Sequence, residues 1–277
     1  MTQQPLDTNP RGRIVPGAEA DLLATAAYAS LLTDVADLSA GDWGRSTDCA
    51  GWTVRDVVAH LVGAAQGHAS MPTFMRQYMW GMRHRQAFDG SSLDAMNQHQ
   101  IDGQEGHSTD RLVQELIELA PRAVAGRSRR ARLLGWAPIG IEEAGSWSVG
   151  TPTKTTMAEL CAVILTRDVW AHRLDLTRAI GKAPALDPDV DRRIVADLVA
   201  DWANRHGQPV TLTLTGDAGG TFTIGTAGAA LTLDALDFAR LMAGRRPDSD
   251  TPTRPCGPPK CSSDPRPPGL PNGNGPT

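Results

Sequence analysis

The chain has 277 residues, 40% of them hydrophobic and 21% charged, and a formal net charge of −4. This composition is typical of a soluble globular protein with one large domain or two modest ones. The negative balance gives no broad attraction for nucleic acid or anionic membranes, and no run approaches the roughly 18 to 20 apolar residues of a membrane span. The first residues lack the apolar core of a signal peptide, so we expect a cytoplasmic protein without nucleic-acid or membrane partners.

Cysteine usage agrees with a reducing compartment, where free thiols are more common than disulfides. We interpret Cys49 and Cys161 as structural, because neither has an obvious activating base in the sequence around it. Cys256 and Cys261 have no matching second pair, so they make a poor zinc knuckle.

The N-terminal half reads as a short arm followed by three long helices. Residues 1–17 are polar and rich in proline, which predicts a flexible arm. Apolar residues at steps of four and three predict a helix over 18–38, a second helix beginning at Val54 and a third beginning at Ser108. Between the last two, we interpret the methionine- and aromatic-rich run MPTFMRQYMWGM as core packing and expect a short helix near SLDAMNQH.

The most informative stretch runs from Thr156 to Gly181. It opens on a capping-box pattern, Thr156 to Glu159, and closes on a glycine suited to the left-handed position after a helix. Between them lies a core-facing stripe at steps of four and three. Its members are Cys161, Leu165, Asp168, His172, Leu176 and Ala179.

Two members of this stripe are ionisable, and burying either is costly unless a partner satisfies it. Asp168 and His172 are one turn apart, so they are neighbours on the helix surface. They could bond each other, converge on a divalent metal with a third ligand, or indicate that the stripe is drawn one position off. The pair alone leaves these alternatives open.

After Gly181 the pattern changes. Asp187 and Pro188 begin another amphipathic helix, PVTLTLTG and TFTIG read as a hairpin, AALTL as a third short strand and DALDFARLMAGR as a final helix. Residues 247–277 hold ten of the 20 prolines and almost nothing apolar, so we expect disorder there. The predicted protein is mainly α with a small α+β domain: an arm (1–17), a four-helix bundle (18–182), a C-terminal helix and β-hairpin domain (183–246) and a proline-rich tail (247–277).

Bundle cores often hold metals between facing helices, and His60 is the candidate third ligand. Counting about 100° per residue, His60 points about 130° away from the centre of its helix's apolar stripe. Periodicity alone therefore places it at the boundary of the core.

Three motifs carry a resemblance to a known family. CAGWTVRDVVAHL (49–61), DVWAHRLDL (168–176) and the ending DFARLMAGR (237–245) resemble, in this order, the signatures of the mycothiol-dependent maleylpyruvate isomerase family. That family belongs to the DinB-like metal-binding four-helix bundles and carries a sterol-carrier-like C-terminal domain. The resemblance spans roughly residues 18–246.

The resemblance implies a site and a chemistry. His60, Asp168 and His172 match the family's metal ligands, although the family usually has glutamate where this chain has the shorter Asp168. Two imidazoles, a carboxylate and open positions suit catalytic zinc first, among divalent metals. The metal would hold the thiolate of mycothiol, the actinobacterial glutathione substitute, and its sulfur would add to a small electrophile, giving isomerisation or S-transfer. A family arginine that helps with an anionic substrate matches Arg245 or Arg246.

Two alternatives remain at this stage. The same bundle could be a metal-dependent hydrolase in which the metal activates water. It could also be a non-catalytic protein that binds a metal or a small molecule. We expect small-molecule partners only, a substrate and a low-molecular-weight thiol, and a monomer or homodimer.

Overall fold

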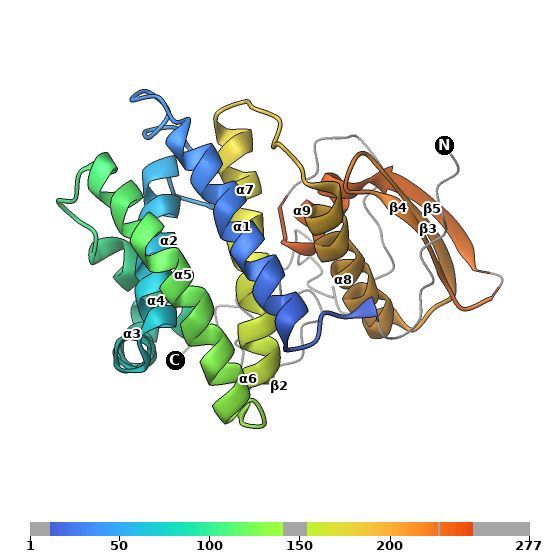
Figure 1. The fold of residues 1–277 in the computed structure, drawn as a ribbon, viewed down its shortest axis with the longest axis horizontal. Helices are drawn as coiled ribbons and strands as arrows, with labels where there is room; N and C mark the ends of the chain where they lie inside the picture. Colours follow the sequence, from blue (N-terminus) through green and yellow to red (C-terminus); the bar gives the residue numbers. More distant parts are fainter. Residues whose placement is uncertain (1–11, 141–153, 227, 246–277) are drawn as a thin grey trace, which may run out of the picture.

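The computed structural model describes residues 12–140, 154–226 and 228–245. Four long helices pack around one apolar core, as the sequence predicts, and Figure 1 shows them side by side. They are α1 (Ala18–Ala36), α2 (Val54–Ala69), α5 (Thr109–Leu134) and α7 (Leu165–Ala179). Among the described residues, no helix is both long and apolar enough to cross a membrane.

Shorter elements lie outside the core of the four long helices. Two of them, α3 and α4, pack on each other and on α2, and a two-stranded ladder of β1 and β2 lies beyond the end of α5 (Figure 1). These elements are α3 (Met71–His84), η2 (Arg85–Phe88), α4 (Ser92–Asp102), β1 (Pro138–Gly140) and β2 (Lys154–Thr156).

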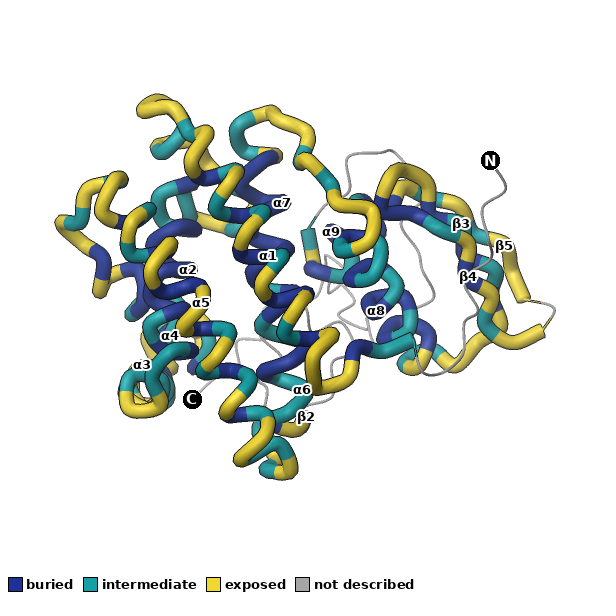
Figure 2. Tube along the Cα trace, viewed as in Figure 1, coloured by how far each residue is buried: buried dark blue, intermediate teal, exposed yellow. Residues whose placement is uncertain are grey.

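The expectation that the methionine-rich run packs in the core is wrong. Only Gln77 and Gly81 of α3 are buried, whereas Met71, Met75 and Met79 are 36–43% exposed. Figure 2 shows α2 mostly buried and the outer side of α3 exposed. The physical reason is that α3 packs on α2 through Gln77 and on α4 through Gly81, and turns its methionines away.

The helix predicted over 156–181 is continuous but not uniform. Thr156 caps its start, since the hydroxyl accepts a hydrogen bond from the Glu159 amide at 3.2 Å, and Gly181 follows its end with φ +70°. Between α6 (Met157–Glu159) and α7 lies η4 (Leu160–Ile164), a π-helical segment. Such segments interrupt an α-helix with wider turns and often lie at functional sites.

The C-terminal part forms a small α+β unit. In the sheet, β3 pairs antiparallel with β4 and parallel with β5, and Leu212 lies opposite both Phe222 and Leu231. Figure 1 shows α8 and α9 between this sheet and the bundle. The elements are α8 (Pro188–His206), β3 (Val210–Thr215), β4 (Gly220–Ile224), β5 (Ala229–Asp234) and α9 (Ala235–Met242).

The two parts share α7, one face of which packs on the bundle and the other on the C-terminal unit. Buried Arg167 donates to Asp197 and Asp201 of α8, each at 2.8 Å. Ile14, in the segment expected to be a flexible arm, is 4% exposed, and its amide donates to Asp197 at 2.7 Å. The arm is therefore anchored before α1 begins, and α7 holds a fixed position against α8.

Candidate metal centre

Three side chains from two distant segments meet inside the bundle. His60 on α2 and Asp168 and His172 on α7 place a ligand atom each so that all lie within 4.8 Å of one another. Asp168 Oδ2 lies 3.8 Å from His60 Nε2, and Asp168 Oδ1 lies 3.5 Å from His172 Nε2. The two imidazole centroids are 5.1 Å apart. The structure thus brings together the three residues that the sequence predicts as ligands.

His60 lies in the core, whereas periodicity predicts that it lies at the boundary of the core. Its exposed fraction is 4%, and every residue from Val57 to Ala65 is buried. The helix starts at a capping box in which the Thr53 hydroxyl and the Asp56 amide pair. Because α3, α4, α5 and α7 all pack on α2, no side of this stretch faces solvent.

A metal fits the chemistry of this donor set. Both ring nitrogens of His60 are buried and have no hydrogen-bond partner among the described residues, although buried polar atoms normally do. Ligand atoms about 2.0–2.1 Å from a tetrahedral zinc are roughly 3.3–3.4 Å from one another. The 3.5 and 3.8 Å separations at Asp168 are close to that value. The shorter aspartate therefore reaches both histidines from its place on α7.

The surroundings leave one side of the cluster accessible. The Asp168 side chain keeps 25% of its surface exposed, whereas the imidazoles are nearly covered. Trp52 covers both of them, with ring centroids 5.1 Å from His60 and 6.0 Å from His172. A small ligand would therefore approach from the carboxylate side.

Burial and charge set the protonation of the three groups. Burial, helped by the neighbouring His172, lowers the pKa of His60, which keeps this imidazole neutral and able to bind a metal. Burial alone would also lower the pKa of His172, but Asp168 and Asp175 outweigh it and raise that pKa well above its usual value. Burial opposes ionisation of Asp168 as well, yet the two histidines lower its pKa, so it is a carboxylate.

Behind His172 lies a group of side chains that sequence reasoning missed. His172 Nδ1 lies 3.1 Å from Asp175 Oδ2, so Asp175 accepts the Nδ1 proton and leaves Nε2 facing Asp168. Carboxylates commonly orient metal-binding histidines in this way. The spacing of three residues on one helix was a visible signal, but the core-facing stripe did not include Asp175.

Arg245 fixes that carboxylate from the C-terminal part of the chain. Its Nε and Nη2 donate to Asp175 Oδ1 and Oδ2 at 3.1 and 2.7 Å, and Nη1 donates to the Ala243 carbonyl at 2.7 Å. The predicted catalytic arginine thus lies at the site, but it holds Asp175. Arg246, the other candidate, lies outside the described residues.

Cys49 has the basic neighbours that its sequence context did not reveal. Its sulfur lies 3.7 Å from His172 Nδ1, 3.3 Å from Asp175 Oδ2 and 3.2 Å from Arg245 Nη2. Cys49, His172 and Asp175 therefore form a second group with possible metal ligands. We do not assign a metal to it, because the Arg245 cation already lies against two of its three members.

Comparisons with known proteins concern the family and the fold of the chain. The family model described as "Mycothiol maleylpyruvate isomerase N-terminal domain" matches residues 24–177. The crystal structure of a mycothiol-dependent maleylpyruvate isomerase is similar over 83% of this chain and 90% of that chain, at 16% identity and a TM-score of 0.51. A histidine-to-alanine mutant of the mycothiol-dependent maleylpyruvate isomerase matches over 82% and 88%, at 14% identity and a TM-score of 0.49. No curated protein matches the chain.

The family match covers more than half of the chain, including His60, Asp168 and His172. The solved isomerase supports the same fold over both the bundle and the C-terminal unit. The chain therefore belongs to the mycothiol maleylpyruvate isomerase family and is an enzyme of that family.

Proposed function

We propose that this protein is a metal-dependent, mycothiol-using isomerase or S-transferase that acts on a small, electrophilic, anionic substrate. The observation that carries the proposal is the convergence of His60, Asp168 and His172, in which both His60 nitrogens are buried and have no hydrogen-bond partner among the described residues. The family and the similar solved enzyme supply the thiol, since both are named for mycothiol. Such a thiol and its thiolate chemistry belong to the reducing cytoplasm.

His60, Asp168 and His172 would hold the metal, with zinc favoured by two imidazoles and one carboxylate. A divalent metal bound there would favour the thiolate form of a coordinated thiol and so supply the nucleophile at neutral pH. The thiolate would form a C–S bond to the electrophilic carbon of the substrate. Formation of this bond would move the π electrons of the substrate's double bond onto its conjugated carbonyl and leave a single bond that can rotate. Return of those electrons would expel the thiolate and give the isomer, whereas uptake of the proton released by the thiol would keep the C–S bond and give S-transfer.

The remaining residues orient and shield these ligands. Asp175 keeps the proton of His172 on Nδ1, so that Nε2 is the atom presented to the site. Arg245 is a positioning residue in this scheme, because three of its N–H groups already bind Asp175 and the Ala243 carbonyl. Trp52 keeps water from one face of the two imidazoles.

Purified protein loaded with zinc would be assayed on maleylpyruvate with and without mycothiol, beside His60→Ala and the exposed-histidine control His84→Ala. We expect turnover that requires the thiol and is lost in His60→Ala but kept in His84→Ala. If maleylpyruvate is not turned over, conjugation of mycothiol to other electrophiles tests the S-transferase form. Turnover indifferent to the thiol would refute the proposal and indicate activated water instead.

A further inference from the structure

Arg127 on α5 is a deeply buried cation that has no counter-ion within the part of the chain that the structure describes. It is 2% exposed, and none of its three guanidinium nitrogens has a hydrogen-bond partner among the described residues. Every other buried arginine among the described residues has a hydrogen-bond acceptor. Arg167 and Arg173 pair with aspartates, Arg240 pairs with Asp48, and Arg130 donates to two backbone carbonyls. A buried, unpaired guanidinium pays a large desolvation penalty, so its retention calls for a partner.

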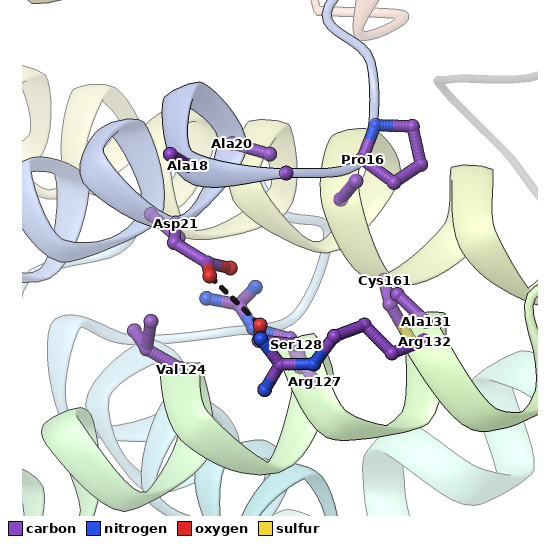
Figure 3. A pocket seen from close by; sticks show the side chains of 13 residues that line it. Pro16, Ala18, Ala20, Asp21, Val124, Arg127, Ser128, Ala131, Arg132 and Cys161 are labelled. Carbon is purple, nitrogen blue, oxygen red and sulfur yellow. Dashed lines mark hydrogen bonds between the residues drawn. The ribbon is translucent and has the colours of Figure 1, made fainter.

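The side chain lines a pocket that could admit such a partner. The pocket has a volume of about 330 Å³ and lies between the start of α1, the second half of α5 and the π-helical segment η4. Figure 3 shows its walls, with Asp21 and Ser128 joined by a hydrogen bond and Cys161 on the opposite side. The wider turn of η4 supplies Cys161 and Ala162 to the wall.

The charge of the lining favours an anion. Arg127 and Arg132 line the pocket with two positive charges, against one negative charge on Asp21. The Asp21 carboxylate is already bound by the Ser128 hydroxyl at 2.7 Å and makes no ion pair with Arg127. Guanidinium groups bind carboxylates through two parallel hydrogen bonds, so a carboxylate would satisfy donors that are now unused.

Tyr28 of α1 lies beside Arg127. The Arg127 guanidinium carbon lies 5.4 Å from the Tyr28 ring centroid, and the buried Tyr28 hydroxyl also has no partner among the described residues. Burial raises the pKa of Tyr28, while the charges of Arg127 and Asp168 act on it in opposite directions.

We propose that Arg127 forms a carboxylate-binding subsite in this pocket and holds one end of a small organic anion there. This inference rests on the proposed function for the identity of the anion as the substrate. It also supplies the cation for an anionic substrate, a role that Arg245 does not fill because it is bound to Asp175.

Maleate is a suitable probe because it carries two carboxylates on a short rigid chain, and its uncharged diamide is the matched neutral compound. Binding of each to metal-free full-length protein would be measured by calorimetry. We expect wild type to bind maleate and not the diamide, and Arg127→Met to bind maleate at least about tenfold more weakly. Arg129→Met, an exposed arginine on the same helix, is the control and should bind as wild type.

Unfolding in the absence of ligand separates a binding role from a structural one. Because Arg127 has no hydrogen bond among the described residues to lose and only the Tyr28 ring beside it, Arg127→Met should be as stable as wild type or more stable. Equal maleate binding by wild type and Arg127→Met, or no binding by wild type, would overturn the proposal. If Arg127→Met does not fold, Ala131→Phe, which narrows the pocket without removing the cation, should weaken maleate binding, and unchanged binding would overturn the proposal equally.

The same experiment distinguishes this subsite from the proposed function. Thiol-dependent turnover without maleate binding at Arg127 would remove the subsite and leave the function. A second outcome is that Arg127→Met loses maleate binding while wild type shows no thiol-dependent turnover. That outcome would support the anion site and refute the proposed reaction.

Discussion

Replacing Asp175 by asparagine should weaken metal binding without removing a ligand. The Asp175 carboxylate accepts from His172 Nδ1 at 3.1 Å and from two nitrogens of Arg245 at 2.7 and 3.1 Å. An amide has one acceptor oxygen, so it cannot keep all of these bonds and no longer favours the Nδ1–H form of His172. Losing a carboxylate behind a metal-binding histidine typically costs 10- to 100-fold in metal affinity, or about 1.4–2.8 kcal/mol.

The same substitution should also destabilise the fold, because Arg245 loses a buried ionic partner. Removing one member of a buried ion pair costs about 3–5 kcal/mol, and the remaining amide oxygen favours the lower end of that range. Asp34→Asn is the matched control, since Asp34 of α1 accepts from Nε of Arg173 at 2.6 Å. Arg173 lies on α7 like Asp175, but its polar partners Asp34, Ala185 and Asp191 are not metal ligands. It should lose stability and keep its metal affinity.

The assay pairs zinc titration against a competing chelator with urea unfolding of the metal-free protein. Asp175→Asn should have a lower zinc affinity and a lower unfolding free energy than wild type, whereas Asp34→Asn should have only a lower unfolding free energy. Wild-type zinc affinity in Asp175→Asn would refute the role assigned to this carboxylate. A loss of zinc affinity in Asp34→Asn as large as in Asp175→Asn would show that general destabilisation explains the effect.

Two further predictions concern the fold. Burial raises the pKa of Asp201, but the charge of Arg167 outweighs burial and lowers the folded-state pKa. The pairing therefore stabilises the fold fully above about pH 4, and this stabilisation is lost as the pH falls through the folded-state pKa. In urea unfolding, Asp201→Asn should cost about 2 kcal/mol at pH 7 and progressively less as the pH falls below the unfolded-state pKa of about 4, whereas a constant difference would contradict the pairing. A Cβ on Gly126 would lie 2.2 Å from the His68 carbonyl oxygen, so Gly126→Ala should lower the unfolding free energy by about 1–3 kcal/mol. Gly41→Ala meets nothing within 4 Å and is the control, and equal stability of the two variants would show that α5 does not need this close approach to α2.

The main helices were predictable because their signals are local. Ser108, Thr156 and Asp187 each cap the helix that they were expected to begin. The stripes of α1 and α5 point into one core, since each of these helices keeps a solvent-facing side that preserves the period. The hairpin and the third strand follow the alternation of Val210, Leu212 and Leu214 with threonines.

Periodicity failed where a helix has no exposed side. His60 seemed to lie about 130° from the apolar stripe when counted at about 100° per residue, yet α2 is buried all round, so direction along it no longer separates core from surface. The prediction that the methionines of α3 are buried failed for a different reason. Their apolar character says that they can be buried, but only the packing of α3 on α2 decides which side is covered.

The parts of the site that are distant in sequence could not be inferred from any local pattern. Asp175 and Arg245 are 70 residues apart, and Cys49 is 196 residues from Arg245. Their meeting depends on how the end of α9 packs against α7. Arg127 lies in a run of basic residues, RSRRAR (127–132), and only the depth of α5 in the bundle reveals that its charge is buried.

The metal content of purified, zinc-loaded protein tests the central claim most directly. After removal of unbound zinc, wild type and His84→Ala should retain about one ion per chain, whereas His60→Ala and His172→Ala should retain far less. These results would establish that α2 and α7 hold one metal between them. Wild type without a near-stoichiometric ion, or unchanged content in His60→Ala and His172→Ala, would contradict the account.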